Sequence, residues 1–165
     1  MFYENEFAVI GTPTNLMISI ITASVICSIL LYSIITLSEE SQTHLVKKQI
    51  DKIRSGAENM FEYANSGSKL KIDVKFPESM RFAVFGKIPD DTLKPSNFEL
   101  DKNMSNNYYF IMENGDICTY SSNARFCGNS TDRVAVLNNG EYSIYLELVC
   151  KDGMTYVKIY WRSGT

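Results

Sequence analysis

The chain has few of the residues that enzymes and metal proteins use for chemistry. It contains one histidine, His44, and its four cysteines form no C-x-x-C pair, so the usual spacings of zinc ligands are absent. It has no glycine-rich phosphate loop, and no serine lies in a nucleophile elbow. We therefore predict that the protein is not an enzyme and that it has no catalytic residues, metal ligands or cofactor.

The chain also lacks an excess of positive charge. Its 16 Lys and Arg residues stand against 19 Asp and Glu, and the two signs are interleaved along the sequence. Nucleic-acid binding depends on clustered positive charge, so we predict no nucleic-acid partner. Two acidic pairs, Glu39-Glu40 and Asp90-Asp91, are interpreted as solvated residues rather than as cation sites.

Charge is missing altogether from residues 15–37, NLMISIITASVICSILLYSIITL. A helix of that length spans about 34 Å, which is enough to cross a hydrocarbon core of about 30 Å. Its Ser and Thr hydroxyls can bond back to the carbonyls of the helix itself. We therefore predict a membrane-inserted helix. Its acidic start, with Glu4 and Glu6, and its long apolar run differ from a cleaved signal peptide, so we predict that it is retained.

The segment after this run is interpreted as a continuation of the same helix, and the segment before it as a lead to the start of the helix. Residues 1–14 are a short lead in which Pro13 suits a first helical turn, where its missing N–H has no partner. Residues 38–66 carry apolar residues at spacings of three and four, which predicts an amphipathic helix ended by Gly67. The apolar stripe consists of Leu45, Val46, Ile50, Ile53, Ala57, Met60, Phe61 and Ala64.

Residues 67–165 alternate apolar and polar side chains in short runs separated by turn residues, as antiparallel strands do. The predicted strands are 70–76, 80–86, 108–112, 117–120, 133–137 and the two arms of a last hairpin that turns at Asp152-Gly153. Residues 87–106 and 121–132 are predicted loops. The predicted fold class is α+β, with a long N-terminal helix, transmembrane and then amphipathic, packed on an antiparallel β-sheet or small β-sandwich.

Cysteines and glycosylation sequons bear on which side of the membrane the β-rich part lies. Cys118–Cys127 closes the shortest loop and is the predicted disulfide, which requires an oxidising compartment. Asn103 and Asn129 begin N-x-S/T sequons and are candidate glycosylation sites. The positive-inside rule favours the opposite side, because Lys and Arg are absent before the span and present after it. We favour an extracellular C-terminal domain.

The order of the segments along the chain resembles that of a known protein family. An uncharged helix continues into an amphipathic one, followed by a polar stop, Ser66-Gly67-Ser68, and a strand that ends in proline, KLKIDVKFP. The chain closes with the alternating hairpin GEYSIYLELVCKDGMTYVKIYW. This layout resembles archaeal type IV pilin-like proteins over nearly the whole chain. The resemblance implies four parts: an N-terminal lead (1–14), a transmembrane or assembly helix (15–37), an amphipathic extension (38–66) and an extracytoplasmic antiparallel β-domain (67–165).

The resemblance also implies a processing site between Gly11 and Thr12, because prepilin leaders end in glycine and are cut by a membrane peptidase. Two features depart from the family pattern. No Lys or Arg precedes Gly11, and the fifth residue after it is Leu16 rather than Glu. These departures favour a minor or accessory subunit, or an anchored protein that is not cut.

Two functions follow. The first is a pilin-like subunit, anchored in the cell membrane by residues 15–37, that assembles with copies of itself or with other pilin-like subunits in a type IV-type surface filament or its accessory complex. A helix that is apolar on every side is accommodated by lipid or by other such helices. The alternative is a single-pass membrane-anchored extracellular binding module, such as a receptor, an adhesin component or an archaellum stator-like protein. Its outward aromatic residues would bind the partner, and its N-terminus would remain uncut.

Overall fold

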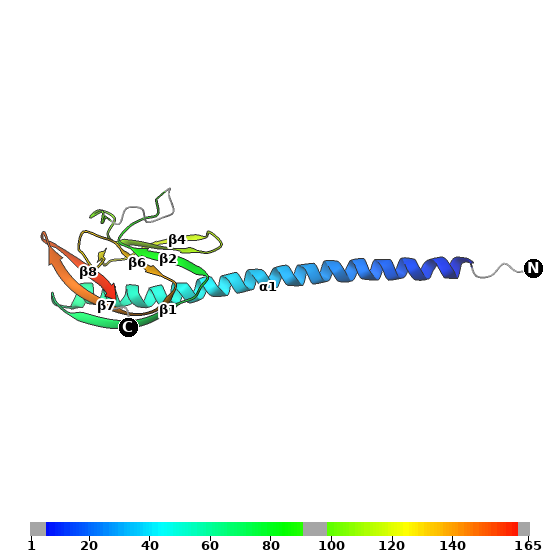
Figure 1. Cartoon of the computed structure of the whole chain (residues 1–165), viewed down its shortest axis with the longest axis horizontal. Helices are drawn as coiled ribbons and strands as arrows, with labels where there is room; N and C mark the ends of the chain where they lie inside the picture. The colour runs from blue at the N-terminus through cyan, green and yellow to red at the C-terminus, as the bar shows by residue number, and fades with distance from the viewer. Residues whose placement is uncertain (1–5, 91–98, 162–165) are drawn as a thin grey trace, which may run out of the picture. The chain divides into compact units, whose positions relative to one another are not determined.

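A computed structural model describes residues 6–90 and 99–161 of the chain, in two compact units that divide between Ser41 and Gln42. The helix α1 (Glu6–Tyr63) belongs to both units, and eight strands, β1 to β8, belong to the second (Figure 1). The second unit, called the body below, combines part of α1 with two sheets. The predicted α+β fold class is confirmed.

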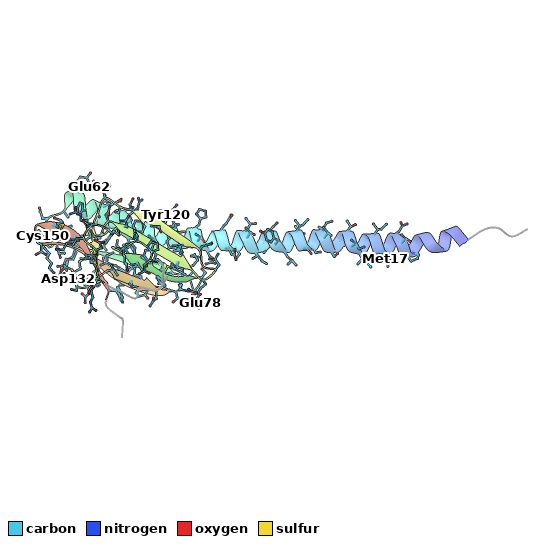
Figure 2. All side chains as sticks on the ribbon, turned by 90° about the horizontal axis from the view of Figure 1, so that it is seen from above. Met17, Glu62, Glu78, Tyr120, Asp132 and Cys150 are labelled. Carbon is cyan, nitrogen blue, oxygen red and sulfur yellow. The ribbon has the colours of Figure 1, made fainter. Side chains whose placement is uncertain are left out.

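The first unit consists of α1 alone among the described residues. Figure 2 shows side chains, Met17 among them, standing out from this part of the helix. None of the most apolar stretch is buried against the rest of the chain. The described residues contain one helix that is long and apolar enough to cross a membrane, judged by length and composition.

The two ends of α1 differ from the predicted ends. Pro13 lies inside the helix rather than in its first turn. The φ angle of proline is that of a helix, so the chain can continue through it at the cost of one backbone hydrogen bond and some crowding by the ring. At the other end α1 stops at Tyr63. Gly67, the predicted stop, has a φ of 89° and donates its N–H to the carbonyl of Leu148 at 2.8 Å, so it directs the chain into β1.

The first sheet has the strand order β1-β7-β8-β5. Its members are β1 (Lys69–Phe76), β7 (Gly140–Lys151), β8 (Met154–Trp161) and β5 (Phe126–Cys127). The β7–β8 hairpin is confirmed, and Asp152 and Gly153 both have positive φ, 53° and 75°, as a type I′ turn requires. The prediction that 121–132 is all loop was wrong at β5. This strand pairs in parallel with β8 and is too short to show an alternating pattern.

The second sheet has the order β4-β3-β2-β6, with antiparallel pairs throughout. Its members are β2 (Met80–Phe85), β3 (Asn107–Met112), β4 (Ile117–Ser121) and β6 (Ala135–Asn138). The β3–β4 turn contains Gly115 at a φ of 93°, in the Asn-Gly turn signal of the sequence. β6 begins two residues later than predicted. Although β1 and β2 are consecutive, they lie in different sheets, so the chain crosses between sheets at residues 77–79.

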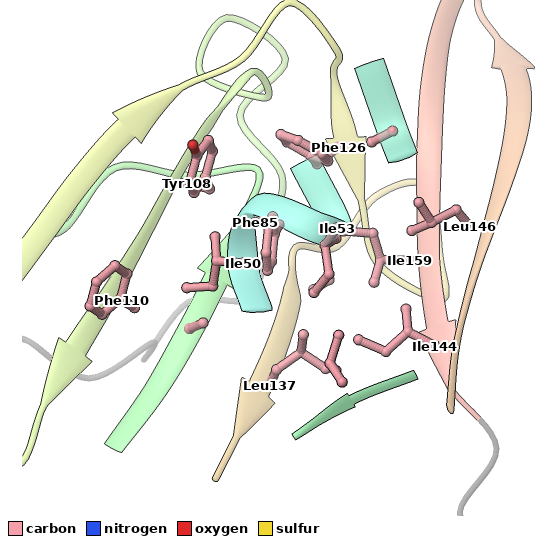
Figure 3. Packing of buried hydrophobic residues seen from close by; sticks show 14 of the residues in the cluster. Ile50, Ile53, Phe85, Tyr108, Phe110, Phe126, Leu137, Ile144, Leu146 and Ile159 are labelled. Carbon is pink, nitrogen blue, oxygen red and sulfur yellow. The ribbon is translucent and has the colours of Figure 1, made fainter. Parts of the chain in front are cut away.

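The core of the body lies between the two sheets, and the C-terminal part of α1 runs within it (Figure 3). Five residues of the predicted stripe are buried at alternating spacings of four and three: Val46, Ile50, Ile53, Ala57 and Met60. They form one cluster with inward side chains of both sheets. Leu45 was also predicted to belong to the stripe, but it is 46% exposed because it lies one residue to the side of the buried face.

Gly56 lets α1 approach the first sheet closely. A Cβ at this position would lie 2.7 Å from Cδ1 of Ile72 and 3.3 Å from Cδ1 of Leu146. The helix also contacts the second sheet, since Nζ of Lys47 lies 5.4 Å from the centre of the Tyr120 ring. The helix therefore occupies the space between the sheets instead of covering one of them from outside.

The outer face of the second sheet is buried as well. It carries a smaller apolar cluster: Phe82, Val84, Tyr109, Ile111 and Val134, with Leu100 and Val136 packed against it. A sheet buried on both faces is built from nearly continuous apolar runs rather than from strict alternation. This explains the sequences MRFAVF in β2 and NYYFIM in β3.

Candidate functional site

The segment 15–37 presents a continuous exposed apolar surface. The exposed fractions of its large apolar side chains run from 52% at Ile26 to 74% at Tyr32. Water is a poor solvent for such a surface, and patches of this extent mark contacts with lipid or protein. The segment therefore requires contact with lipid or with another protein, because the rest of the described chain does not cover it.

Every Ser and Thr hydroxyl in this segment is bonded inside the helix. Each donates to a carbonyl three or four residues earlier, at distances from 2.8 to 3.1 Å: Ser19, Thr22, Ser24, Ser28, Ser33 and Thr36. An unpaired hydroxyl in hydrocarbon costs several kcal/mol, about 4–8 on water-to-alkane scales. The predicted back-bonding is confirmed, and it makes these polar side chains compatible with lipid.

All four cysteines are free thiols, so the predicted Cys118–Cys127 disulfide is not present. The two residues are near in sequence but lie in different sheets, Cys118 in β4 and Cys127 in β5. Packed sheets lie about 10 Å apart, whereas a disulfide needs Cα atoms within about 7 Å. The short loop that suggested the bond spans this gap, and the disulfide no longer supports an oxidising compartment.

The cysteines differ sharply in expected reactivity. Cys127 is buried, and burial raises the pKa of its thiol to about 12. At pH 8 only about one Cys127 side chain in ten thousand is then a thiolate. We expect iodoacetamide to modify the exposed Cys150 in the native protein and to leave Cys127 unmodified, as read by peptide mass spectrometry.

Unfolding provides the control for this prediction, since both thiols should react in denaturant. Pretreatment with a reductant should leave the pattern unchanged. If Cys118 and Cys127 became reactive in denaturant only after reduction, a disulfide would be present and the free-thiol assignment would be wrong.

Both candidate glycosylation residues, Asn103 and Asn129, are exposed. The hydroxyl residues of their sequons differ. Ser105 is 1% exposed and donates its hydroxyl to the carbonyl of Lys102 at 2.9 Å, whereas Thr131 is half-buried. The second sequon is therefore the more accessible of the two in the folded body.

The remaining predicted residues are dispersed. Gly11 and Thr12 both lie in α1, and the structure does not describe the side chain of Thr12. Asp90 accepts a hydrogen bond from Nζ of Lys87 at 2.9 Å, and Asp91 lies outside the described residues. In the ranges 13–90 and 99–161, no three His, Cys, Asp or Glu side chains gather as metal ligands.

One hollow of the body is lined by Arg133, Tyr160 and Trp161 together, and we call it the Trp161 hollow. Its volume is about 360 Å³. It is lined by Asn129, Ser130, Arg133, Val134, Ala135, Val136, Tyr160 and Trp161. Sequence reasoning did not find it, because its walls come from β6, the turn before it and the end of β8. Only the folded body brings these segments together.

The aromatic residues of β3 and β8 divide into two groups. Four are buried and serve the packing of the body: Tyr108, Tyr109, Phe110 and Tyr156. Tyr160 and Trp161 remain partly accessible and line the Trp161 hollow.

No protein-family model, curated protein or solved structure matches this chain.

Proposed function

We propose that this protein is a pilin-like subunit, held in the cell membrane by residues 15–37, that packs through this helix with copies of itself or other pilin-like subunits. The assembly is a type IV-type surface filament or its accessory complex. The observation that carries the proposal is the uncharged helical segment 15–37, whose large apolar side chains are exposed and whose Ser and Thr hydroxyls are bonded within the helix. Two environments suit such a helix, namely lipid and a bundle of similar helices.

The order of parts supports the same proposal. An apolar helical segment is followed by a helical segment embedded in a two-sheet body, within one helix α1. Leu16, in place of a glutamate, favours a minor or accessory subunit over a major one.

The intact mass of the mature protein, taken from membranes that contain a prepilin peptidase, tests processing. A mass lacking residues 1–11 is the result expected of a processed subunit. The full-length mass would favour a permanent single-pass anchor.

Cysteine cross-linking tests whether the helices pack together. Cys27 is the only cysteine of the segment, and it is exposed. In a cysteine-free background, single cysteines placed one at a time at positions 20 to 31 should form oxidative dimers at every third or fourth position, because only one helix face meets its neighbour. Uniformly weak cross-linking along the segment would argue for a helix surrounded by lipid.

We place the body outside the cell. This placement rests on the β-rich body and on the two exposed sequon asparagines, Asn103 and Asn129. The exposed thiol of Cys150 provides the test. A membrane-impermeant maleimide applied to intact cells should label Cys150, and labelling that appears only after permeabilisation would place the body in the cytoplasm.

A second function, the single-pass extracellular binding module, is favoured by the Trp161 hollow. A partly exposed tryptophan beside an arginine without an ion pair among the described residues is a typical feature of recognition surfaces. In that case residues 15–37 remain in lipid, and the body carries the activity.

A further inference from the structure

The Trp161 hollow lies between β8 and β6, at edges where these strands have no further strand partner among the described residues. β5 pairs with β8 only at Val157 and Lys158, so the last residues of β8 have no strand partner on that side among the described residues. β6 is an edge strand of the second sheet. The hollow is bounded by these two edges and by the turn that carries Asn129 and Ser130.

The aromatic wall of the hollow is held in place by neighbouring rings. Trp161 contacts Tyr142 edge to face, with ring centroids 5.8 Å apart. Tyr160 stacks on Tyr145 at 5.6 Å, and Nζ of Lys158 lies 5.3 Å from the Tyr160 ring. Trp161 nevertheless remains 37% exposed. Part of the Trp161 indole is thus open to a ligand. Because neighbouring rings already fix the indole in place, binding costs little side-chain conformational entropy.

The polar wall of the hollow contains one positively charged side chain, that of Arg133. Arg133 is exposed and forms no ion pair with a described residue. Its neighbour Asp132 is engaged elsewhere, since both of its oxygens accept hydrogen bonds from Nζ of Lys151, at 2.7 and 2.9 Å. Glu99 is paired with Arg133 through a backbone bridge, but their side chains are not ion-paired. The guanidinium is therefore available to a carboxylate, which it can bind through two parallel hydrogen bonds.

We propose that the Trp161 hollow binds a carbohydrate bearing a carboxylate, such as a hexuronic acid unit. The apolar face of the sugar ring packs on the exposed indole, its carboxylate pairs with Arg133, and its hydroxyls meet Ser130. A volume of about 360 Å³ lies at the small end of ligand sites, which suits one or two sugar rings. This inference does not depend on whether residues 15–37 assemble or remain in lipid.

The only tryptophan of the chain is part of the site, so its fluorescence reports on binding directly. Full-length protein in detergent micelles would be titrated with glucuronic acid and, separately, with glucose. We expect a saturable change in Trp161 emission with glucuronic acid and about tenfold to a hundredfold weaker binding of glucose, which lacks the carboxylate. No saturable change with glucuronic acid would overturn the proposal, and so would equal affinity for the two sugars.

Matched variants assign the effect to the hollow. Arg133→Gln should remove the preference for the acidic sugar, whereas Arg125→Gln should keep it, because Arg125 lines a different hollow. Glu99→Gln should preserve binding, since the Glu99 side chain forms no ion pair with Arg133. Equal losses in Arg133→Gln and Arg125→Gln would mean that general charge attraction is responsible, and would overturn the proposal. Thermal melting of each variant checks that the body remains folded.

A peptide that ends in a free carboxylate shares part of this chemistry and is the critical competitor. A short C-terminal peptide titrated in the same way should bind at least about tenfold more weakly than glucuronic acid. If the peptide bound more tightly and Arg133→Gln abolished its binding, the hollow would be a peptide site and the carbohydrate assignment would be wrong.

Discussion

Replacing Ile26 with Asp is expected to remove the protein from the membrane fraction. Ile26 lies at the centre of residues 15–37, eleven residues from either end, and is 52% exposed on the helix surface. An aspartate at the middle of a membrane helix costs about 2.5–3.5 kcal/mol, and the favourable contribution of isoleucine is lost as well. The equilibrium constant for insertion should fall on the order of a hundredfold. Alkaline extraction followed by quantitative blotting of membrane and soluble fractions measures it.

Two control variants make this result specific. Ile26→Ala keeps the segment uncharged and should remain in the membrane. Leu45→Asp adds the same charge to the same helix at an exposed position in the body and should also remain there. If Ile26→Asp resisted alkaline extraction as well as Ile26→Ala does, residues 15–37 would not be the membrane segment, and both proposed functions would lose their anchor.

The variant Ile53→Ala is expected to destabilise the body by about 2–5 kcal/mol. Ile53 is completely buried and lies with Ile50 between the two sheets (Figure 3). Small domains are stable by only about 5–15 kcal/mol, so the loss is a large part of the total. The cause is the cavity left in a core that draws side chains from α1 and from both sheets at once.

Urea titration of the full chain in micelles measures this loss through the fluorescence of Trp161, which lies in the body. Leu45→Ala is the matched control, because Leu45 is an aliphatic residue of the same helix that is 46% exposed. Its effect should stay within about 0.5 kcal/mol. Equal effects of the two substitutions would mean that the helix does not pack between the sheets in solution.

Some features of this protein depend on local sequence alone and were predicted from it. The absence of charge over 23 residues is enough to define the apolar segment, because the cost of burying charge in lipid does not depend on the rest of the fold. The three-and-four spacing of Ile50, Ile53 and Ala57 placed one face of α1 in the core. Asp152-Gly153 predicted the last hairpin, since few residues adopt positive φ at two successive positions.

Other features depend on which distant segments meet, and local sequence carries no signal for them. Cys118 and Cys127 are close along the chain, yet the core separates their sheets, so the shortest loop did not predict a bond. β5 exists only because β8 lies beside it. The Trp161 hollow likewise requires that Arg133 and Trp161, 28 residues apart, come together at two sheet edges. Strand pairing between distant segments decided these three features. The free energy of that pairing comes from contacts that form only when the sheets assemble.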